Sequence, residues 1–276
     1  MRIVRDVKAV RDAVAGSGLV GLVPTMGAFH EGHLSLIRAA REVCDVVVVW
    51  LFVNPTQFNE SADLVAYPRD EARDAALAAE CGADILYAPD VEAVYPVGFA
   101  TTVTVAGLAD VLEGAHRPGH FAGVATVVAK MLNMVGPQVA FFGAKDAQQV
   151  AVVRRMVADL DIPTRIEVLP TVREADGLAM SSRNVRLDPD ERRRATALHR
   201  GLAAARTAVT LGERDAAVLA RRVEDELADA GIVAEYVAVV DPAAFRPVDT
   251  IDRPTLIAVA ARVGATRLID NIEVAP

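Results

Sequence analysis

Cysteine is scarce in this chain of 276 residues. The two cysteines, Cys44 and Cys81, stand in apolar surroundings, with no C-x-x-C pair and no histidine at ligand spacing. This excludes a disulfide framework and a cysteine-ligated zinc site. We expect both thiols to be small core residues in a reducing compartment.

Long hydrophobic runs are also missing. The longest uninterrupted apolar run is 46–53, which is too short to cross a bilayer. The charged start of the chain, residues 1–6, does not have the pattern of a secretory signal. We therefore expect no membrane association and a cytoplasmic location.

Positive charge is the third shortage. The chain has 29 basic and 37 acidic residues and a formal net charge of −8, which argues against a nucleic-acid-binding surface. Of the basic residues only Lys8, Lys130 and Lys145 are lysines. Lys145 follows a glycine in a turn and is thus a candidate for a specific role. The alternative is an ordinary solvated residue at a helix start.

No Walker pattern, G-x-G-x-x-G motif, internal repeat or low-complexity linker is present, so a P-loop or dinucleotide fold is not favoured. Hydrophobic residues make up 53% of the chain, enough for a sizeable core. In the first part, apolar strand patterns alternate with helical ones, which predicts a Rossmann-like, doubly wound parallel sheet of the α/β class. The predicted strands are 19–23, 46–53, 84–88, 101–105, 139–142 and 165–169, and the predicted helices are 4–15, 34–40, 70–81, 108–112, 121–134 and 147–160.

The pattern changes around residues 170–176. Two helices, 189–209 and 215–230, are followed by strands at 233–240, 255–263 and 267–274. Helices followed by hairpin-like strands predict a smaller α+β domain. We expect a nucleotide- and substrate-binding domain at 1–172 and a C-terminal lid domain at 173–276.

The stretch 26–33, Met-Gly-Ala-Phe-His-Glu-Gly-His, carries the strongest local signal. It follows a predicted strand and leads into a predicted helix. Helix starts offer unpaired N–H groups and a positive dipole end, so His30 and His33 are well placed to meet a phosphate chain. The alternative is that the two histidines are surface or capping residues.

Four loops carry polar side chains, and three of them follow predicted strands at one sheet edge, where open α/β sheets bind ligands. They supply imidazoles, a lysine, an arginine, hydroxyls and amides, a set that suits an ATP triphosphate and a small polar substrate held by Gln57 and Gln149. In the alternative interpretation, Gln57 is a turn residue and the serines only cap a helix. The loops are 26–33, 54–57, 143–149 and 180–183.

Ordered segments along nearly the whole chain resemble the pantothenate synthetase, or pantoate beta-alanine ligase, family. The His-Glu-Gly-His stretch is similar to the HIGH-type signature of the nucleotidylyltransferase superfamily. The segments that carry the resemblance are 23–33, 52–58, 67–69, 117–124, 141–146, 176–184 and 267–271.

The resemblance implies a two-step reaction. The carboxylate of pantoate attacks ATP to give pantoyl adenylate and pyrophosphate, and the amine of beta-alanine then displaces AMP. It implies ATP as substrate, assistance by Mg²⁺ without a dedicated protein metal site, and a homodimer. The implied catalytic residues are His33, with the role of proton donor, His30, Lys145 and Arg183.

The resemblance also assigns binding residues. Pantoate would be held by Asn54, Gln57 and Gln149, with Gln57 also near beta-alanine. The implied ATP-binding residues are Met26, Gly27, His30, His33, Gly143, Lys145, Asp146, Val172, Met180, Ser181, Ser182 and Arg183.

The chain departs from the family pattern at two places. Ala144 and Ala147 flank Lys145–Asp146 where the family has a glutamate and an aromatic residue, and Trp50 replaces a small residue. Two rival hypotheses are a paralogous ligase acting on another small hydroxy acid or amine, and a catalytically weakened nucleotide-binding protein with a regulatory role.

Overall fold

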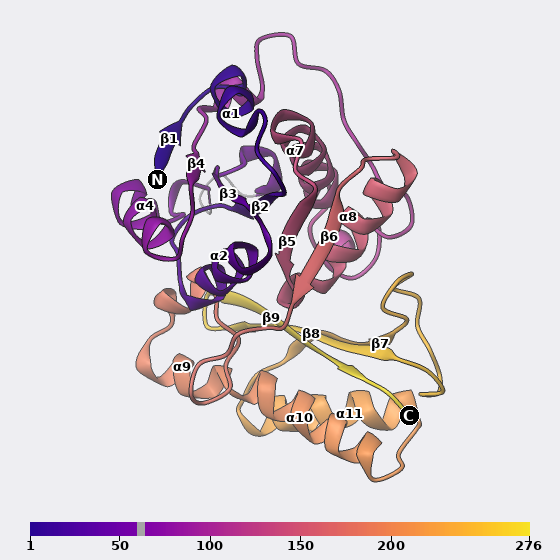
Figure 1. Ribbon diagram of the computed structural model, residues 1–276. Helices are drawn as coiled ribbons and strands as arrows, with labels where there is room; N and C mark the ends of the chain where they lie inside the picture. The colour runs from indigo at the N-terminus through magenta and orange to yellow at the C-terminus, as the bar shows by residue number, and fades with distance from the viewer. Residues whose placement is uncertain (60–63) are drawn as a thin grey trace. The chain divides into compact units, whose positions relative to one another are not determined.

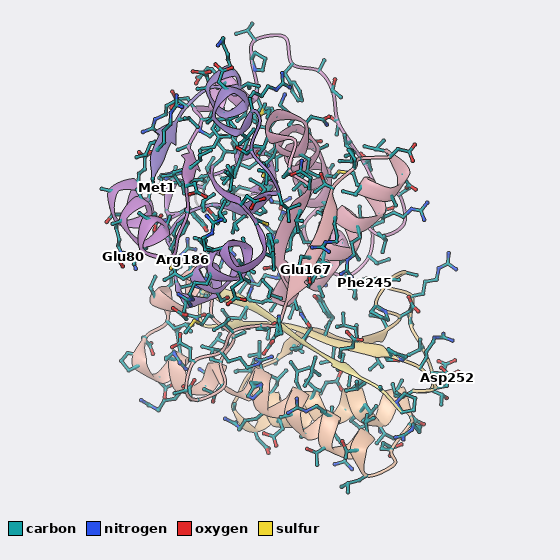
Figure 2. All side chains as sticks on the ribbon, viewed as in Figure 1. Met1, Glu80, Glu167, Arg186, Phe245 and Asp252 are labelled. Carbon is teal, nitrogen blue, oxygen red and sulfur yellow. The ribbon has the colours of Figure 1, made fainter. Side chains whose placement is uncertain are left out.

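The computed structural model describes residues 1–59 and 64–276. The chain forms two compact units, which Figure 1 shows as a ribbon and Figure 2 with side chains. The first unit is Met1–Ala144 with Val152–Pro170, and the second is Lys145–Ala151 with Thr171–Pro276. Within the residues described, no helix is both long and apolar enough to cross a membrane. The expected domain boundary at 172/173 stays a prediction.

The first unit contains the predicted parallel sheet. Its six strands run in the order β1-β4-β3-β2-β5-β6, and every pairing is parallel. The chain moves outward from β2 in one direction and then resumes on its other side at β5, so the topological switch point lies between these two strands. The strands are β1 (Arg2–Val4), β2 (Val20–Thr25), β3 (Val46–Leu51), β4 (Ile85–Tyr87), β5 (Val139–Gly143) and β6 (Arg165–Leu169).

Helices cover both faces of this sheet. Leu86 packs in one apolar cluster with residues of α2 and α4, whereas the hydroxyl of the next residue, Tyr87, donates to Met134 Sδ of α7 at 3.8 Å. Successive side chains of a strand point to opposite faces, so α2 and α4 lie on one face and α7 on the other. The elements are α1 (Val7–Val14), α2 (Glu31–Val43), η1 (Pro55–Gln57), α4 (Glu71–Glu80), α5 (Val91–Val94), α6 (Glu113–His116), α7 (His120–Val135), η2 (Ala144–Asp146) and α8 (Ala147–Asp159).

Residues 101–112 differ from the prediction. The expected strand 101–105 is not a strand, and Val103 N instead donates to the hydroxyl of Thr126 on α7 at 2.9 Å. The expected helix 108–112 is a series of turns, because Gly107 has φ +80° and its N–H is bonded to Asp110 Oδ2. The helix begins only at Glu113, after Leu112 at φ +45°.

The second unit carries the predicted helices and an antiparallel sheet of order β7-β8-β9. The expected long helix 189–209 is interrupted at Thr196, whose hydroxyl donates to Arg193 O at 2.7 Å. Such a bond competes with the helical pattern. The elements are η3 (Ser182–Arg186), α9 (Pro189–Ala195), α10 (Ala197–Thr210), α11 (Ala216–Asp229), β7 (Ala234–Val240), β8 (Thr255–Val263) and β9 (Thr266–Val274).

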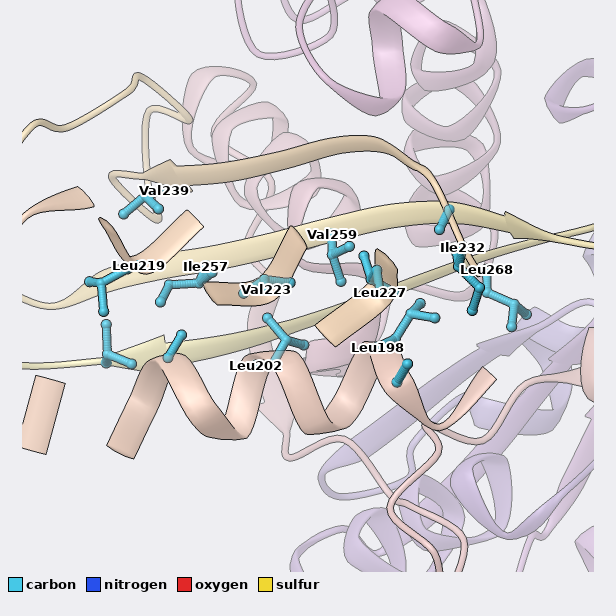
Figure 3. Packing of buried hydrophobic residues seen from close by; sticks show 14 of the residues in the cluster. Leu198, Leu202, Leu219, Val223, Leu227, Ile232, Val239, Ile257, Val259 and Leu268 are labelled. Carbon is cyan, nitrogen blue, oxygen red and sulfur yellow. The ribbon is translucent and has the colours of Figure 1, made fainter. Parts of the chain in front are cut away.

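The core of the second unit lies between this sheet and its helices (Figure 3). Gly201 of α10 lets the two helices approach closely, since a Cβ there would lie 3.1 Å from the Cα of Val223 on α11. Leu268 and Val274 of β9 belong to this core. The labelled core residues are Leu198, Leu202, Leu219, Val223, Leu227, Ile232, Val239, Ile257, Val259 and Leu268.

Candidate active site

The two histidines of the signature stretch form the start of α2. His30 is its N-cap, and its Nδ1 accepts a hydrogen bond from Gly32 N at 3.2 Å. His33 reaches back, with Nδ1 3.4 Å from His30 N, and the two ring centroids are 4.1 Å apart. A neutral imidazole that accepts at Nδ1 carries its proton on Nε2. Both rings are thus set to donate from Nε2 at a helix N-terminus.

A buried carboxylate from α4 holds the turn before these histidines. Asp74 is only 1% exposed, and its two oxygens accept from Ala28 N and Phe29 N, each at 2.8 Å. The turn needs such support because Gly27 and Ala28 have φ values of +89° and +53°. Sequence reasoning missed Asp74, although an acidic residue on the otherwise apolar face of α4 was a usable signal.

Asn54 lies in the loop after the adjacent strand β3 and is also buried, at 1% exposure. Its Oδ1 accepts from Tyr95 Oη at 2.8 Å, and its Nδ2 donates to Gly123 O at 3.2 Å. Burial raises the pKa of Tyr95, against the effect of the hydrogen bonds to Thr56 and Asn54, so this phenol stays protonated and donates. These bonds fix the loop that carries Gln57, and the substrate contact of Asn54 stays a prediction.

The backbone of Gln57 is held by the Arg-Pro-Gly-His segment. His120 Nδ1 lies 2.9 Å from Gln57 O, and Arg117 Nη2 donates to the same carbonyl at 3.1 Å. Arg117 Nη1 lies 3.1 Å from His120 Nε2. These contacts require the His120 tautomer that donates from Nδ1 and accepts at Nε2. Arg117 and His120 therefore have a supporting function that the sequence analysis did not assign.

Strand register brings the loops of the first unit to one edge. Thr25 at the end of β2 pairs with Leu51 at the end of β3, so His30 and His33 follow one strand and Asn54 and Gln57 its neighbour. On its other side β2 pairs with β5, which ends at Gly143. The carboxyl ends at the topological switch point are where open α/β sheets bind ligands.

Lys145, Asp146 and Gln149 follow β5 and pack with the second unit. The side chain of Lys145 is 20% exposed, and its Nζ is 3.7 Å from Asp146 Oδ1. Lys145 O accepts from Asn271 Nδ2 of β9 at 2.7 Å. The flanking Ala144 and Ala147 add only methyl groups to this turn.

Residues 172–183 form a hairpin that leads into η3. Met180 N donates to Val172 O at 3.0 Å, and Arg173 forms an isolated antiparallel bridge with Ala179. Ser181 caps η3 through a bond from Arg183 N to Ser181 Oγ at 3.2 Å. The hairpin therefore places Val172, Met180 and the segment Ser181–Arg183 in one compact structure.

An ion pair fixes the hairpin tip. Arg192 donates to both oxygens of Asp176, at 2.7 and 3.0 Å, and this hydrogen bonding lowers the pKa of the Asp176 carboxyl. His199 lies under Gly177, where a Cβ would come 2.1 Å from His199 Cδ2. Burial, and secondarily the charge of Arg173, lower the pKa of His199. The tip is thus packed against a neutral imidazole.

Trp50 lies in the core of the first unit, near the end of β3. It is 3% exposed, and its ring meets that of Tyr87 edge-on at 4.9 Å and that of Phe52 at 5.8 Å. Its backbone oxygen accepts from the hydroxyl of Thr25 at 2.8 Å. The described residues hold no group of three or more His, Cys, Asp or Glu side chains arranged for a metal ion.

The profile of the Pantoate-beta-alanine ligase family matches residues 2–273. This chain belongs to that family. A pantothenate synthetase of Moorella thermoacetica is 52% identical to it over 277 residues, which cover 99% of this chain and 98% of the relative. The crystal structure of pantothenate synthetase from Thermus thermophilus matches all of both chains, with 48% identity and a TM-score of 0.96.

A more distant family member has been crystallised with ligands. The pantoate-beta-alanine ligase of Francisella tularensis, in complex with beta-gamma ATP and beta-alanine, is 33% identical to this chain. The match covers 99% of this chain and 97% of that one, with a TM-score of 0.83. The fold of the ligase family is therefore shared from end to end, with the parallel sheet and the small antiparallel sheet both in place.

Proposed function

We propose that this protein ligates pantoate and beta-alanine with ATP to form pantothenate. The observation that carries this function is membership of the pantoate-beta-alanine ligase family over residues 2–273. The start of α2 supports this function. His30 and His33 lie there, after the end of the central strand β2, and the loop that carries Asn54 and Gln57 follows the neighbouring strand β3.

The first step activates the acid. A carboxylate oxygen of pantoate attacks the α-phosphorus of ATP, the bond from that phosphorus to the bridging oxygen breaks, and pyrophosphate leaves with the electron pair. We propose that His30 and His33 donate hydrogen bonds from Nε2 to phosphate oxygens, and that the dipole of α2 adds positive potential. The role of proton donor to the leaving pyrophosphate stays a prediction for His33, since it requires the imidazolium form. Lys145, Ser181, Ser182 and Arg183 would neutralise the charge that develops on the leaving group.

The second step forms the amide. The neutral amine of beta-alanine attacks the carbonyl carbon of pantoyl adenylate, the carbon–oxygen bond to AMP breaks, and the nitrogen loses a proton. We propose that Gln57 and Gln149 hold pantoate, because a carboxamide can donate to and accept from its hydroxyls. Gly143, Asp146 and the backbone near Val172 would hold the adenosine, and Met26, Gly27 and Met180 are also proposed to contact ATP.

Mg²⁺ is proposed to arrive with ATP. This ion prefers oxygen ligands and is held in nucleotide sites through phosphate oxygens and one or two carboxylates. Asp146 is an exposed carboxylate in the proposed ATP segment, so the donor chemistry fits. When bound, the ion supplies positive charge to the triphosphate. The proposed homodimer and cytoplasmic location stay predictions, and light scattering of the purified protein would test the first.

Release of AMP tests the function directly. We expect AMP formation to require both pantoate and beta-alanine, and exchange of labelled pyrophosphate into ATP to require pantoate alone. His33→Ala and Lys145→Ala should lower the exchange rate by about 10²-fold or more, as the loss of transition-state stabilisation does, with an unchanged thermal midpoint. A faster reaction with another hydroxy acid or amine would indicate a paralogous ligase. Binding of ATP without turnover would indicate a nucleotide-binding protein with a regulatory role.

A further inference from the structure

Two consecutive residues of β9 contact both of the ATP segments proposed for the second unit. Asp270 shares the strand face of Leu268 and Val274, which lie in the apolar core, whereas Asn271 lies on the opposite face because side chains alternate along a strand. Both are polar and buried, with 3% and 9% exposure. Because buried polar side chains are normally hydrogen-bonded, the partners of each residue should explain why it is there.

Asp270 reaches the hairpin. Its carboxylate accepts two bonds from Arg173, at 2.6 Å from Nη1 and 3.0 Å from Nη2. The same guanidinium donates from Nη1 to Gly177 O at 3.0 Å. The guanidinium of Arg173 thus joins the first strand of the hairpin both to β9 and to Gly177 at the tip. Gly177 lies four residues before Ser181 in the chain.

Asn271 reaches the lysine turn. Its Nδ2 donates to Lys145 O at 2.7 Å, across a separation of 126 residues. Its backbone also belongs to the Asp270 network, since Arg173 Nη2 is 3.4 Å from Asn271 O and Asn271 N donates to Asp270 Oδ1 at 2.8 Å. One dipeptide therefore sets the lysine turn and the serine-arginine hairpin relative to each other.

Stability alone does not account for this arrangement. A buried ion pair contributes little stability compared with apolar residues of the same volume, and its best-supported use is to specify one conformation. We infer that Asp270 and Asn271 are positioning residues that hold the Lys145 turn and the 172–183 hairpin in the one arrangement that binds the triphosphate. This inference rests on the proposed role of Lys145 and Ser181–Arg183 in binding ATP.

Three variants separate positioning from stability. Asn271→Asp keeps the shape but cannot donate to Lys145 O, Asn271→Ala removes the amide, and Asp270→Asn removes the charge opposite Arg173. The control is Glu235→Gln, which weakens a less buried ion pair on the same sheet, in which Arg267 Nε donates to Glu235 at 2.6 Å. Asn271→Ala keeps the test valid if Asp270→Asn fails to fold.

We expect each Asn271 variant to raise KM for ATP roughly tenfold and to slow pyrophosphate exchange by a similar factor, the effect of one lost buried hydrogen bond. KM for beta-alanine, measured with preformed pantoyl adenylate, should stay unchanged. Glu235→Gln should lower the thermal midpoint without a change in KM for ATP. The inference is wrong if the Asn271 variants keep a normal KM for ATP, or if the control raises it equally. An inactive wild-type protein would instead refute the proposed function.

Discussion

Replacement of Asp74 is the sharpest test of how the turn before His30 is built. Asp74→Ala removes the acceptors of Ala28 N and Phe29 N, both bonded at 2.8 Å. Hydrogen bonds to a charged group contribute about 1.5–3 kcal/mol each, so loss of both bonds would lower the free energy of unfolding by about 3–6 kcal/mol if nothing replaced them. Water entering the space of the carboxylate can satisfy part of the freed N–H groups, so we expect a loss near the lower end.

Asp74→Asn is a milder change to the same position and allows comparison with Asp74→Ala. The carboxamide keeps one acceptor oxygen and turns an NH2 group toward the other backbone donor, so about half of the Ala effect should remain if the bonds act independently. Activity should respond more strongly than stability. His30 follows Phe29 directly, and a misplacement of about 1 Å at a reacting group can cost about 10²-fold in rate.

Urea unfolding and AMP release measure the two effects side by side. The control is Asp70→Ala on the same helix, since Asp70 is exposed and caps α4 by accepting from Arg73 N at 3.0 Å. Loss of this cap should cost about 1 kcal/mol and leave kcat unchanged. If Asp74→Ala lowers stability but keeps the wild-type kcat, the turn holds its histidines without Asp74, and the reasoning fails.

Two further substitutions probe the supports of the other loops. The pKa of His199 is lowered in the folded state, so the unfolded chain binds a proton at higher pH, and the free energy of unfolding should fall as pH drops below about 6.5. Urea unfolding at about pH 5.5 and 7.5 should therefore show a smaller difference for His199→Gln than for the wild type. An unchanged difference between the two pH values would contradict this role of His199. Gly123→Ala would place a Cβ 2.4 Å from Thr56 O, so α7 or η1 must shift, and KM for pantoate should rise several-fold, whereas Gly201→Ala in the second unit should lower only the unfolding midpoint. Equal KM values for these two glycine variants would show that η1 does not position Gln57.

The sheet was predictable because its strands carry strong local patterns. The β-branched run that contains β3 is apolar at every position, as expected for a strand buried on both faces of a parallel sheet. The three residues of β1 gave no such signal, and their pairing with β4 depends on residues more than 80 positions away. The interruption at Thr196 and the turns at 107–112 involve side-chain hydrogen bonds and, at Gly107 and Leu112, positive φ values, none of which periodicity reports.

The residues proposed to carry the chemistry stand in local sequence patterns, whereas their supports do not. The histidine stretch is a local pattern, visible within eight residues. Asp74 acts on Ala28 over a separation of 46 residues, and Arg173 on Asp270 over 97. Nothing in the neighbourhood of an isolated Asp shows which distant backbone group it will meet, so these roles emerge only from the fold.

The supports share one design, which explains why they are polar residues in apolar surroundings. The turns proposed to bind ligands expose part of their backbone. Each is therefore fixed by a side chain on a regular element: Asp74 on α4 binds N–H groups, whereas His120 on α7 and Asn271 on β9 bind carbonyl oxygens. A loop anchored in this way keeps its geometry only while the anchor keeps its hydrogen bonds. We therefore infer that activity depends on residues that need not contact a substrate, such as the buried Asp74 and Asn271.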